Sequence, residues 1–183
     1  MQKKYDLLSE NGVVILNLVS SIAGERAKFL EAEYKTYSQI FPEVFIIPVV
    51  NPDGKEHDIS GSRYKFWRKN RNQNNDGTYG VDLNRNYGYG WGGAGASKKP
   101  KSDTYHGLSA FSEPETAAIQ KFVQSHPNLT TLLTYHTFSQ LVMWPWGHDE
   151  GDIPNAKDLE VFKTMGTKMA SWNGYKPMKS GDL

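Results

Sequence analysis

Three segments of this chain have sequence patterns typical of β-strands. Residues 12–19 read Gly-Val-Val-Ile-Leu-Asn-Leu-Val, residues 44–50 form a second apolar run, and residues 130–135 form a third candidate strand. Continuous runs of this kind are typical of strands buried in a parallel sheet. The pattern predicts three adjacent buried strands, which are Val13–Leu18, Phe45–Val50 and Leu132–Tyr135.

Segments with helical spacing separate these strands. Residues 23–41 predict one helix, and Ser112-Glu113-Pro114-Glu115 resembles a capping box that begins a second helix ending near residue 126. A last helix is predicted over 156–172, with Asn173-Gly174 as its stop. Its expected inward face consists of Leu159, Phe162, Met165, Met169 and Trp172. This order of elements predicts an α/β fold, a three-layer sandwich with a mixed, mainly parallel sheet.

A long polar and glycine-rich stretch, residues 53–110, follows the second strand. A loop of this length in a compact domain is usually functional, and its many aromatic residues favour a structured loop. It is introduced by Asn51-Pro52-Asp53-Gly54, which we interpret as a turn. This turn and His136 both follow predicted strands, at the sheet edge where ligands bind in open α/β folds.

Composition narrows the possible functions. The chain has 183 residues and a net charge of +1, which suggests one domain and gives no indication of nucleic-acid or membrane binding. It has no cysteine, so disulfides and thiolate metal sites are excluded. We find no signal peptide and no membrane-spanning segment, and we expect a monomer.

Arginine and asparagine are concentrated in two parts of the long loop, Phe66–Arg71 and Asp82–Asn86. The guanidinium group matches a carboxylate with two parallel hydrogen bonds, so this composition suits a site that grips a free carboxylate. A solvated basic loop without a ligand is the alternative.

Six motifs occur in a fixed order along the chain: Asn-Pro-Asp-Gly at 51–54, Trp-Arg-Lys-Asn-Arg at 67–71, Asp-Leu-Asn-Arg-Asn-Tyr at 82–87, Thr-Tyr-His-Gly at 104–107, Ala-Phe-Ser-Glu-Pro-Glu-Thr at 110–116 and Tyr-His-Thr-Phe-Ser-Gln at 135–140. Together they resemble the zinc metallocarboxypeptidases of the carboxypeptidase A/B/T type, with the bacterial T branch most similar. The resemblance covers 44–183, and residues 1–43 match poorly. It implies a single, partial peptidase domain over 1–183 with an incomplete zinc carboxypeptidase fold, which is phosphorylase/hydrolase-like.

The resemblance implies roles for individual residues. Asn84 and Arg85 would bind the C-terminal carboxylate of a peptide, Arg71 would support this binding, and Arg68 would stabilise the oxyanion of the tetrahedral intermediate. His136 would be a zinc ligand. Lys65 would lie near the substrate channel, although solvated surface is the favoured interpretation for Lys65 and Lys69. Asp82 could orient Arg85 or another loop group. Cis peptide bonds are implied before Phe138 and Trp146.

The zinc ligands are incomplete in the sequence. Catalytic zinc takes three protein ligands and an open position for water. The family supplies two of them from a His-x-x-Glu pair, and no histidine here has a glutamate three residues away. The best positional match keeps Glu25 as the acid and has Ile22 in place of the histidine; Glu25 as the acid of a helix N-terminus is the alternative. The family's general-base glutamate would lie beyond Leu183. We expect zinc to bind weakly or not at all.

Three hypotheses remain open. The first is a zinc metallocarboxypeptidase that hydrolyses C-terminal residues of peptides in the intact enzyme, with this chain alone inactive. The second is an inactive carboxypeptidase-like module that binds peptide or protein C-termini. The third is a structural relic without a ligand. The resemblance implies an extracellular, secreted protein.

Overall fold

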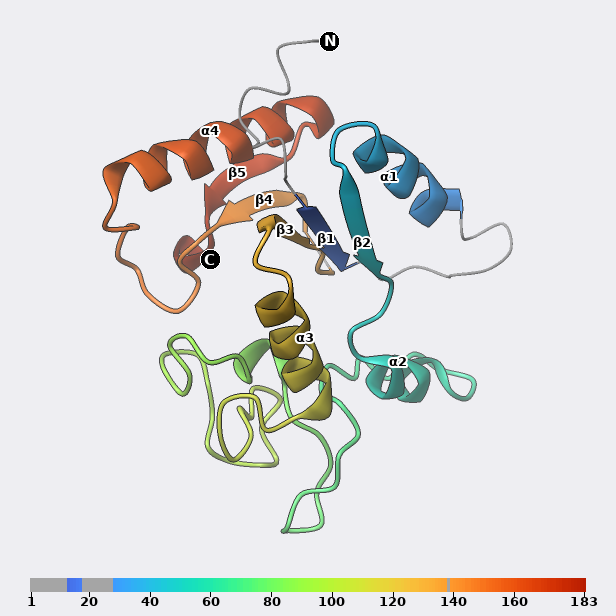
Figure 1. Ribbon diagram of the computed structural model, residues 1–183. Coiled ribbons are helices and arrows are strands. Elements are labelled where there is room, and N and C mark those ends of the chain that lie inside the picture. Colours follow the sequence, from blue (N-terminus) through green and yellow to red (C-terminus); the bar gives the residue numbers. More distant parts are fainter. Residues whose placement is uncertain (1–12, 18–27, 138) are drawn as a thin grey trace. The chain divides into compact units, whose positions relative to one another are not determined.

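The computed structural model describes residues 13–17, 28–137 and 139–183 (Figure 1). The described residues fall into two compact units. The first contains the chain up to Trp91 together with Ser97–His136, and the second contains Gly92–Ala96 and Thr137–Leu183. Each unit is described by itself below. Within the described part of the chain, no helix is both long and apolar enough to cross a membrane.

A parallel sheet of three strands forms the centre of the first unit. Strands β1 (Val13–Asn17), β2 (Glu43–Ile47) and β3 (Leu129–Thr134) lie in the order β2-β1-β3. In the register, Leu16 of β1 pairs with Ile46 on one side and with Leu133 on the other. The three predicted strands are therefore confirmed as neighbours in a single parallel sheet, although β2 ends at Ile47 and not at Val50, and β3 begins at Leu129 and not at Leu132.

Helices cover both faces of this sheet at β2. Phe45 packs edge-on against Phe122 of α3 (Pro114–Ser125), with ring centroids 4.9 Å apart. The next residues on either side, Val44 and Ile46, pack against Phe41, which follows α1 (Lys28–Ser38). Because successive side chains of a strand point to opposite faces, α1 and α3 lie on opposite sides of the sheet. This is the three-layer arrangement that the sequence predicts.

Strand β3 differs from its prediction as a buried strand. Its residues alternate between half-buried and exposed, and Leu132 is 52% exposed. Leu133, in the half-buried row, packs against Phe41, whereas Leu132 points to the opposite face, so the two faces of β3 are covered unequally.

Two local predictions, the turn at 51–54 and the capping box at 112–115, need correction. The Asn51–Gly54 segment is not a free turn but the beginning of α2 (Pro52–Ile59), where Asn51 Oδ1 accepts from the backbone N–H of Gly54 at 3.0 Å. The capping box at 112–115 is also wrong. The N-cap residue of α3 is Glu113, without a side-chain cap, because the Ser112 hydroxyl instead donates to the Glu113 carboxylate at 2.8 Å.

The long loop after α2 has little regular structure but many internal hydrogen bonds. It contains one short 3₁₀ helix, η3 (Leu83–Arg85). Backbone bonds join Asn70 to Val81 and Asp82 to Tyr105. Gly80 has φ +86°, and a Cβ there would lie 2.4 Å from the Asn70 carbonyl oxygen, so only glycine fits. The prediction of a structured loop is confirmed.

The second unit contains elements that the sequence pattern did not predict. Strands β4 (Leu141–Trp144) and β5 (Lys176–Lys179) form a parallel pair, and α4 (Ala156–Asn173) packs on both. A final 3₁₀ turn, η4, covers Ser180–Asp182. The predicted stop of α4 is confirmed, because Gly174 caps it in the left-handed conformation.

The inner face of α4 is only partly as predicted. Leu159, Met165 and Met169 are half-buried, but Trp172 is 58% exposed and Phe162 is also exposed. The buried residues are the small ones, Gly166 and Ala170. The Trp144 ring lies so close to Gly166 that a Cβ on residue 166 would be 2.7 Å from it. A glycine at this position therefore leaves the space that the Trp144 ring occupies.

Of the two implied cis bonds, the one at Pro145–Trp146 is confirmed. Phe138 lies outside the described residues.

Candidate carboxylate-binding site

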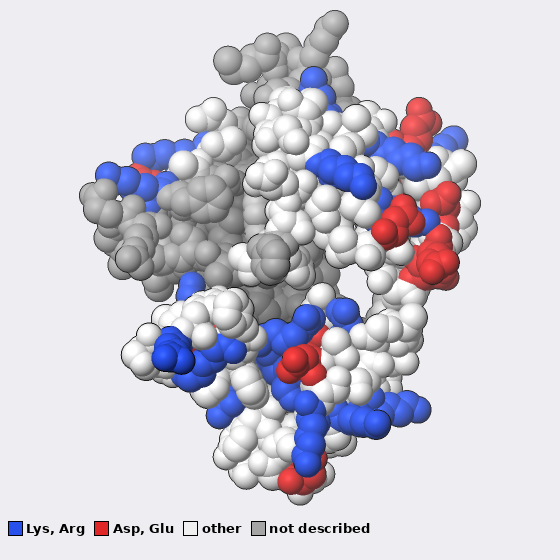
Figure 2. Space-filling model, turned by 180° about the vertical axis from the view of Figure 1, so that it is seen from behind, with Lys and Arg blue, Asp and Glu red and all other residues white. Residues whose placement is uncertain are grey.

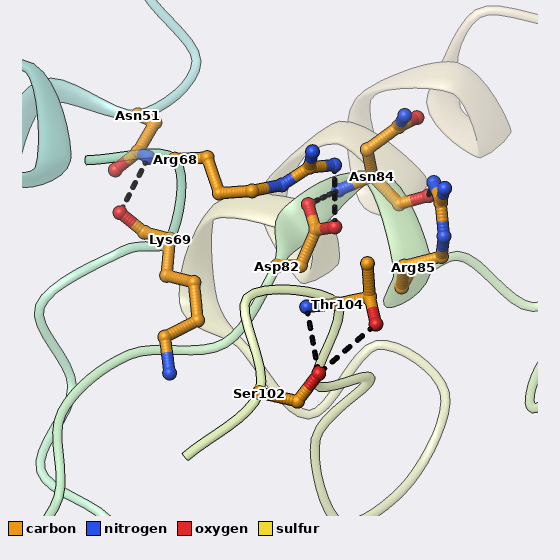
Figure 3. A network of polar contacts seen from close by, with 8 residues as sticks. All are labelled: Asn51, Arg68, Lys69, Asp82, Asn84, Arg85, Ser102 and Thr104. Carbon is orange, nitrogen blue, oxygen red and sulfur yellow. Dashed lines mark hydrogen bonds and ion pairs between the residues drawn. The ribbon is translucent and has the colours of Figure 1, made fainter. Parts of the chain in front are cut away.

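Asp82 organises the arginine-rich part of the loop (Figure 3). Its carboxylate accepts from Arg68 Nη2 at 2.7 Å and from the backbone N–H of Asn84 at 3.1 Å. The Asp82 side chain is 2% exposed, whereas that of Arg68 is 45% exposed. The buried Asp82 carboxylate thus fixes one edge of the Arg68 guanidinium, while the rest of the Arg68 side chain remains accessible to solvent. The loop group that Asp82 orients directly is Arg68.

The 3₁₀ helix η3 decides which of its side chains face outward. Asp82 is its N-cap residue, and Leu83 and Asn86 are buried, whereas Asn84 is exposed and Arg85 is half-buried. Residues three apart lie on the same side of a 3₁₀ helix, so burying Leu83 and Asn86 turns the two residues between them outward. Arg85 Nη1 donates to the Asn84 carbonyl oxygen at 3.1 Å.

Asn86 fixes this turn to the rest of the loop and is fully buried. Its amide nitrogen has three acceptors and its amide oxygen has two donors, which come from both the loop and α3. The partners are the carbonyl oxygens of His106 (2.9 Å) and Ser109 (3.0 Å), the Ser112 hydroxyl (2.9 Å), the Glu113 backbone N–H (3.2 Å) and the Thr116 hydroxyl (2.6 Å).

His136 follows β3 directly and lies in the electrostatic field of the same group. Partial desolvation lowers the pKa of His136, and the positive charges of Arg68 and Arg85 lower it further, while Asp82 acts in the opposite direction. Its Nε2 lies 3.4 Å from the Thr134 hydroxyl. The residue as a whole is exposed although its ring is partly desolvated, and the lowered pKa favours the neutral form, which is the form that binds metals.

These residues form what we call the carboxylate cluster: Arg68, Asp82, Asn84, Arg85 and His136. They come from three separate stretches of sequence in the first unit; Arg68, Asp82, Asn84 and Arg85 lie close together (Figure 3), and the charges of Arg68, Asp82 and Arg85 act on His136. Burial raises the pKa of Asp82, an effect that the nearby Arg68 and Arg85 charges oppose. In Figure 2, lysine and arginine side chains crowd the lower half of the view, where the long loop lies. An anion approaching this loop would therefore be attracted.

The structure places the other predicted residues elsewhere. The Arg71 guanidinium stacks between two aromatic rings, 4.8 Å from the Trp67 centroid and 4.6 Å from that of Tyr79. Lys65 Nζ donates to the His57 and Ser60 carbonyl oxygens at the end of α2. Glu25 lies outside the described residues.

The interpretation of Lys69 as solvated surface is wrong. Lys69 is 4% exposed, and its Nζ donates to the Pro100 carbonyl oxygen at 2.7 Å. Desolvation lowers its pKa. The tight packing of Gly80 on the Lys69 side chain explains the burial. The alternative of a solvated surface for Lys65 holds, because that side chain is exposed.

Several supporting residues escaped sequence reasoning. Asn51, Asn70, Asn86 and Thr116 have no special chemistry, and they matter only through buried contacts. Asp82 was a usable signal in the sequence, because aspartate is a favoured N-cap residue, and here it caps η3 by accepting from the backbone N–H of residue 84.

The described residues do not fit a complete zinc site. Among them, no group of three His, Cys, Asp or Glu side chains is placed to hold a metal ion. His57 packs on Trp67, and His126 and His106 each have Nδ1 next to a backbone carbonyl oxygen. His136 is therefore the one histidine of the cluster, and three ligands are needed.

Comparison with known proteins identifies the relatives of this chain. A family model described as zinc carboxypeptidase matches residues 29–180. The chain is 40% identical over 131 residues to carboxypeptidase B of Helicoverpa zea, a match that covers 69% of this chain and 29% of the relative. It is 36% identical over 136 residues to carboxypeptidase A4 of Mus musculus, covering 73% and 32% of the two chains. The chain thus spans about a third of the length of these curated relatives.

Solved structures agree with the sequence matches. The crystal structure of carboxypeptidase A from Helicoverpa armigera superposes with a TM-score of 0.72 at 27% identity, covering 96% of this chain and 47% of the other. The structure of thrombin-activatable fibrinolysis inhibitor gives a TM-score of 0.77 at 21% identity, with 96% and 48% covered, and shows similarity of fold. The family match covers most of this chain, and the fold agrees. The chain belongs to the zinc carboxypeptidase family.

Proposed function

We propose that this chain forms the part of a carboxypeptidase that binds the C-terminal carboxylate of a peptide, through Asn84 and Arg85, next to the bond that the intact enzyme hydrolyses. The observation that supports this most is the arrangement around Asp82. A buried carboxylate fixes Arg68 and the η3 turn at once, so that three polar side chains lie near each other before any ligand arrives. Such preorganisation reduces the entropy lost on binding.

Arg68 suits a role in stabilising negative charge on the substrate. A guanidinium has five N–H donors, and the bond to Asp82 uses one of them. The remaining N–H donors of Arg68 are available to the substrate carbonyl oxygen as it becomes an oxyanion. A fixed donor at such a position contributes about 3 kcal/mol to lowering a reaction barrier. We propose that Arg71, held between the Trp67 and Tyr79 rings, supports the binding of the peptide carboxylate.

Zinc belongs to the proposed activity of the whole protein. When bound in the family's enzymes, zinc polarises the carbonyl group and activates water. In this chain, His136 is our proposed ligand, and Glu25 is a second proposed ligand outside the described residues. Because the described residues do not complete a zinc site, we attribute to this chain only the binding and orientation of the peptide. We further propose that both compact units belong to one peptidase domain, that it is monomeric and that it acts outside the cell.

The alternative function is a carboxypeptidase-like module that binds peptide C-termini without hydrolysing them. The observation that favours it is the single histidine of the carboxylate cluster. Both functions need the same carboxylate site. The enzyme also binds zinc and hydrolyses the peptide, whereas the binding module does neither.

The experiment that tests the site is a calorimetric titration with acetylated tripeptides that end in a free carboxylate or in an amide. We expect the acids to bind at least tenfold more tightly than the amides, because a bidentate charged contact contributes about 1.5–3 kcal/mol. Arg85→Ala should remove the difference. Arg63→Ala removes an equal charge from an exposed part of the same loop and should preserve it. Equal binding of acids and amides would refute the carboxylate site.

A second measurement separates the two functions. Metal content after dialysis against zinc, together with release of free C-terminal amino acids, should be followed on the same samples. Stoichiometric zinc with turnover supports hydrolysis, whereas carboxylate-dependent binding without either supports the binding module.

A further inference from the structure

A cavity of about 160 Å³ lies within the long loop. Its lining includes buried Val81, Tyr105 and Glu113, and exposed Asp76 and Leu108 form part of its edge. The side chains at 72–75, three asparagines and a glutamine, complete one wall. The residues of the carboxylate cluster do not line this cavity, so its contents are a separate question.

Tyr105 presents an unpaired hydroxyl to this cavity. The residue is 4% exposed, and its backbone N–H and carbonyl oxygen bind Ser102 and Asp82. Its hydroxyl has no hydrogen-bond partner within the described ranges of the chain. It is also not among the fully enclosed unpaired atoms, so it faces open space, and Tyr105 lines the cavity. An accessible tyrosine hydroxyl without a protein partner can donate to or accept from a ligand that enters the cavity.

Glu113 supplies a buried carboxylate to the lining of the same cavity. Its carboxylate accepts from Asn70 and Asn72 side-chain amides at 2.8 and 3.0 Å and from Ser112 at 2.8 Å. All three donors are neutral, and the ion pairs found between described residues do not include Glu113. A carboxylate can accept about four hydrogen bonds, so capacity remains. A buried charge without an opposite charge is costly, and a cationic ligand would offset that cost.

The two carboxylates of the cavity lining, those of Glu113 and Asp76, make its surroundings acidic. Burial raises the pKa of the Tyr105 hydroxyl, and the charges of Glu113 and Asp76 raise it further. Two cations oppose them from outside the lining. Lys69 is bonded to the Pro100 carbonyl oxygen at 2.7 Å, and Lys101 lies close enough to lower the pKa of Asp76. Because the two lysines offset part of the negative charge of Glu113 and Asp76, a ligand with a single positive charge is favoured.

The walls also favour an organic cation over a metal ion. A hard divalent cation is bound by six or more oxygens, usually including several carboxylates, whereas the lining offers two carboxylates, those of Asp76 and Glu113, and the described residues include no group of three His, Cys, Asp or Glu side chains that could hold a metal ion. Val81 and Leu108 offer apolar contact for an aliphatic chain. We propose that this cavity binds a primary alkylammonium group, which donates to the Tyr105 hydroxyl and the Glu113 carboxylate while its aliphatic chain contacts Val81 and Leu108. Free aliphatic amines and lysine side chains share this chemistry.

The test is an NMR titration of the ¹⁵N-labelled chain with n-butylammonium chloride at constant ionic strength. We expect saturable shifts of the backbone amides of residues 72–76 and of Tyr105. n-Butanol has the same aliphatic chain without the charge and should give no saturable shifts. Nα-acetyl-lysine amide distinguishes the sources: comparable affinity indicates a lysine side chain as a ligand, whereas binding of butylammonium alone indicates a free amine.

Two variants make the proposal specific. Tyr105→Phe keeps the ring and should weaken butylammonium binding about tenfold, since a hydrogen bond to a charged group is lost. Asp76→Asn, at an exposed position, should weaken it severalfold through the field alone. Tyr34→Phe removes an exposed hydroxyl from α1 and should leave the affinity unchanged. Shifts that do not saturate, that butanol reproduces, or that persist unchanged in Tyr105→Phe would overturn the proposal.

Discussion

Arg68 Nη2 and Asp82 Oδ2 form a 2.7 Å ion pair in which the carboxylate is buried and the guanidinium is half-exposed. The asymmetry matters more than the pairing itself. A fully exposed pair would contribute little to stability. Here the buried partner is rigid and fixes the direction of the exposed one, so the pair works as a positioning device for Arg68.

Asp82→Asn should therefore weaken the binding of peptide acids and also lower the stability of the chain. The amide accepts only at its oxygen and has no charge, so Arg68 loses its fixed direction. We expect about tenfold weaker binding of peptide acids and a loss of about 1–3 kcal/mol in the free energy of unfolding. Calorimetry and urea denaturation measure the two effects. Unchanged binding in a folded Asp82→Asn chain would show that the pair does not position Arg68.

Asn86→Ala should be among the most destabilising substitutions in the loop. It removes five hydrogen bonds from a fully buried position and leaves partners such as the Thr116 hydroxyl without one of theirs. Each buried group left unpaired costs about 1–3 kcal/mol, so a total loss above about 3 kcal/mol is expected in urea denaturation. The matched control is Asn75→Ala, at an exposed position, which should change stability by less than about 0.5 kcal/mol.

Lys69 should make stability increase with pH in the alkaline range. Desolvation lowers its pKa in the folded state below the ordinary value of 10.5. Between the two pKa values the unfolded chain binds more protons, so the free energy of unfolding rises as pH increases through this range and levels off above 10.5. Urea denaturation of wild type and Lys69→Met from pH 8 upward isolates this contribution. A difference between the two proteins that stays constant with pH would contradict it.

Arg71 should contribute to stability through its two aromatic neighbours. Each cation–π contact contributes about 0.5–1 kcal/mol, so Arg71→Ala should lower the free energy of unfolding by about 1–2 kcal/mol. Arg71→Lys should recover less than half of the loss, because an ammonium does not stack between two rings as a planar guanidinium does. Peptide binding measured on both variants tests the supporting role. If Arg71 holds the segment that carries Arg68, Arg71→Ala should lose more affinity for peptides than Arg71→Lys, in parallel with its larger loss of stability.

The sequence by itself determined the family, the strands and the chemistry of the carboxylate cluster. Apolar runs 13–18, 45–50 and 132–135 identified the sheet, because a strand buried in a parallel sheet is a local pattern. Motif order identified Arg68, Asn84, Arg85 and His136 as candidates. The composition of 53–110 indicated a structured loop, because aromatic residues in that number need packing partners.

Only the tertiary structure decided which polar residues are inside. Lys69, Asn86 and Glu113 are of types that sequence reasoning assigns to solvent, and each is buried because a segment distant in the chain supplies its hydrogen-bond partners. The same is true of α4, where Trp172 is exposed and Gly166 is buried, since the position of the Trp144 ring sets the inner face. The pairing of Arg68 with Asp82 likewise joins positions 14 residues apart. Local patterns encode propensity and periodicity, whereas these contacts depend on where the chain returns in space.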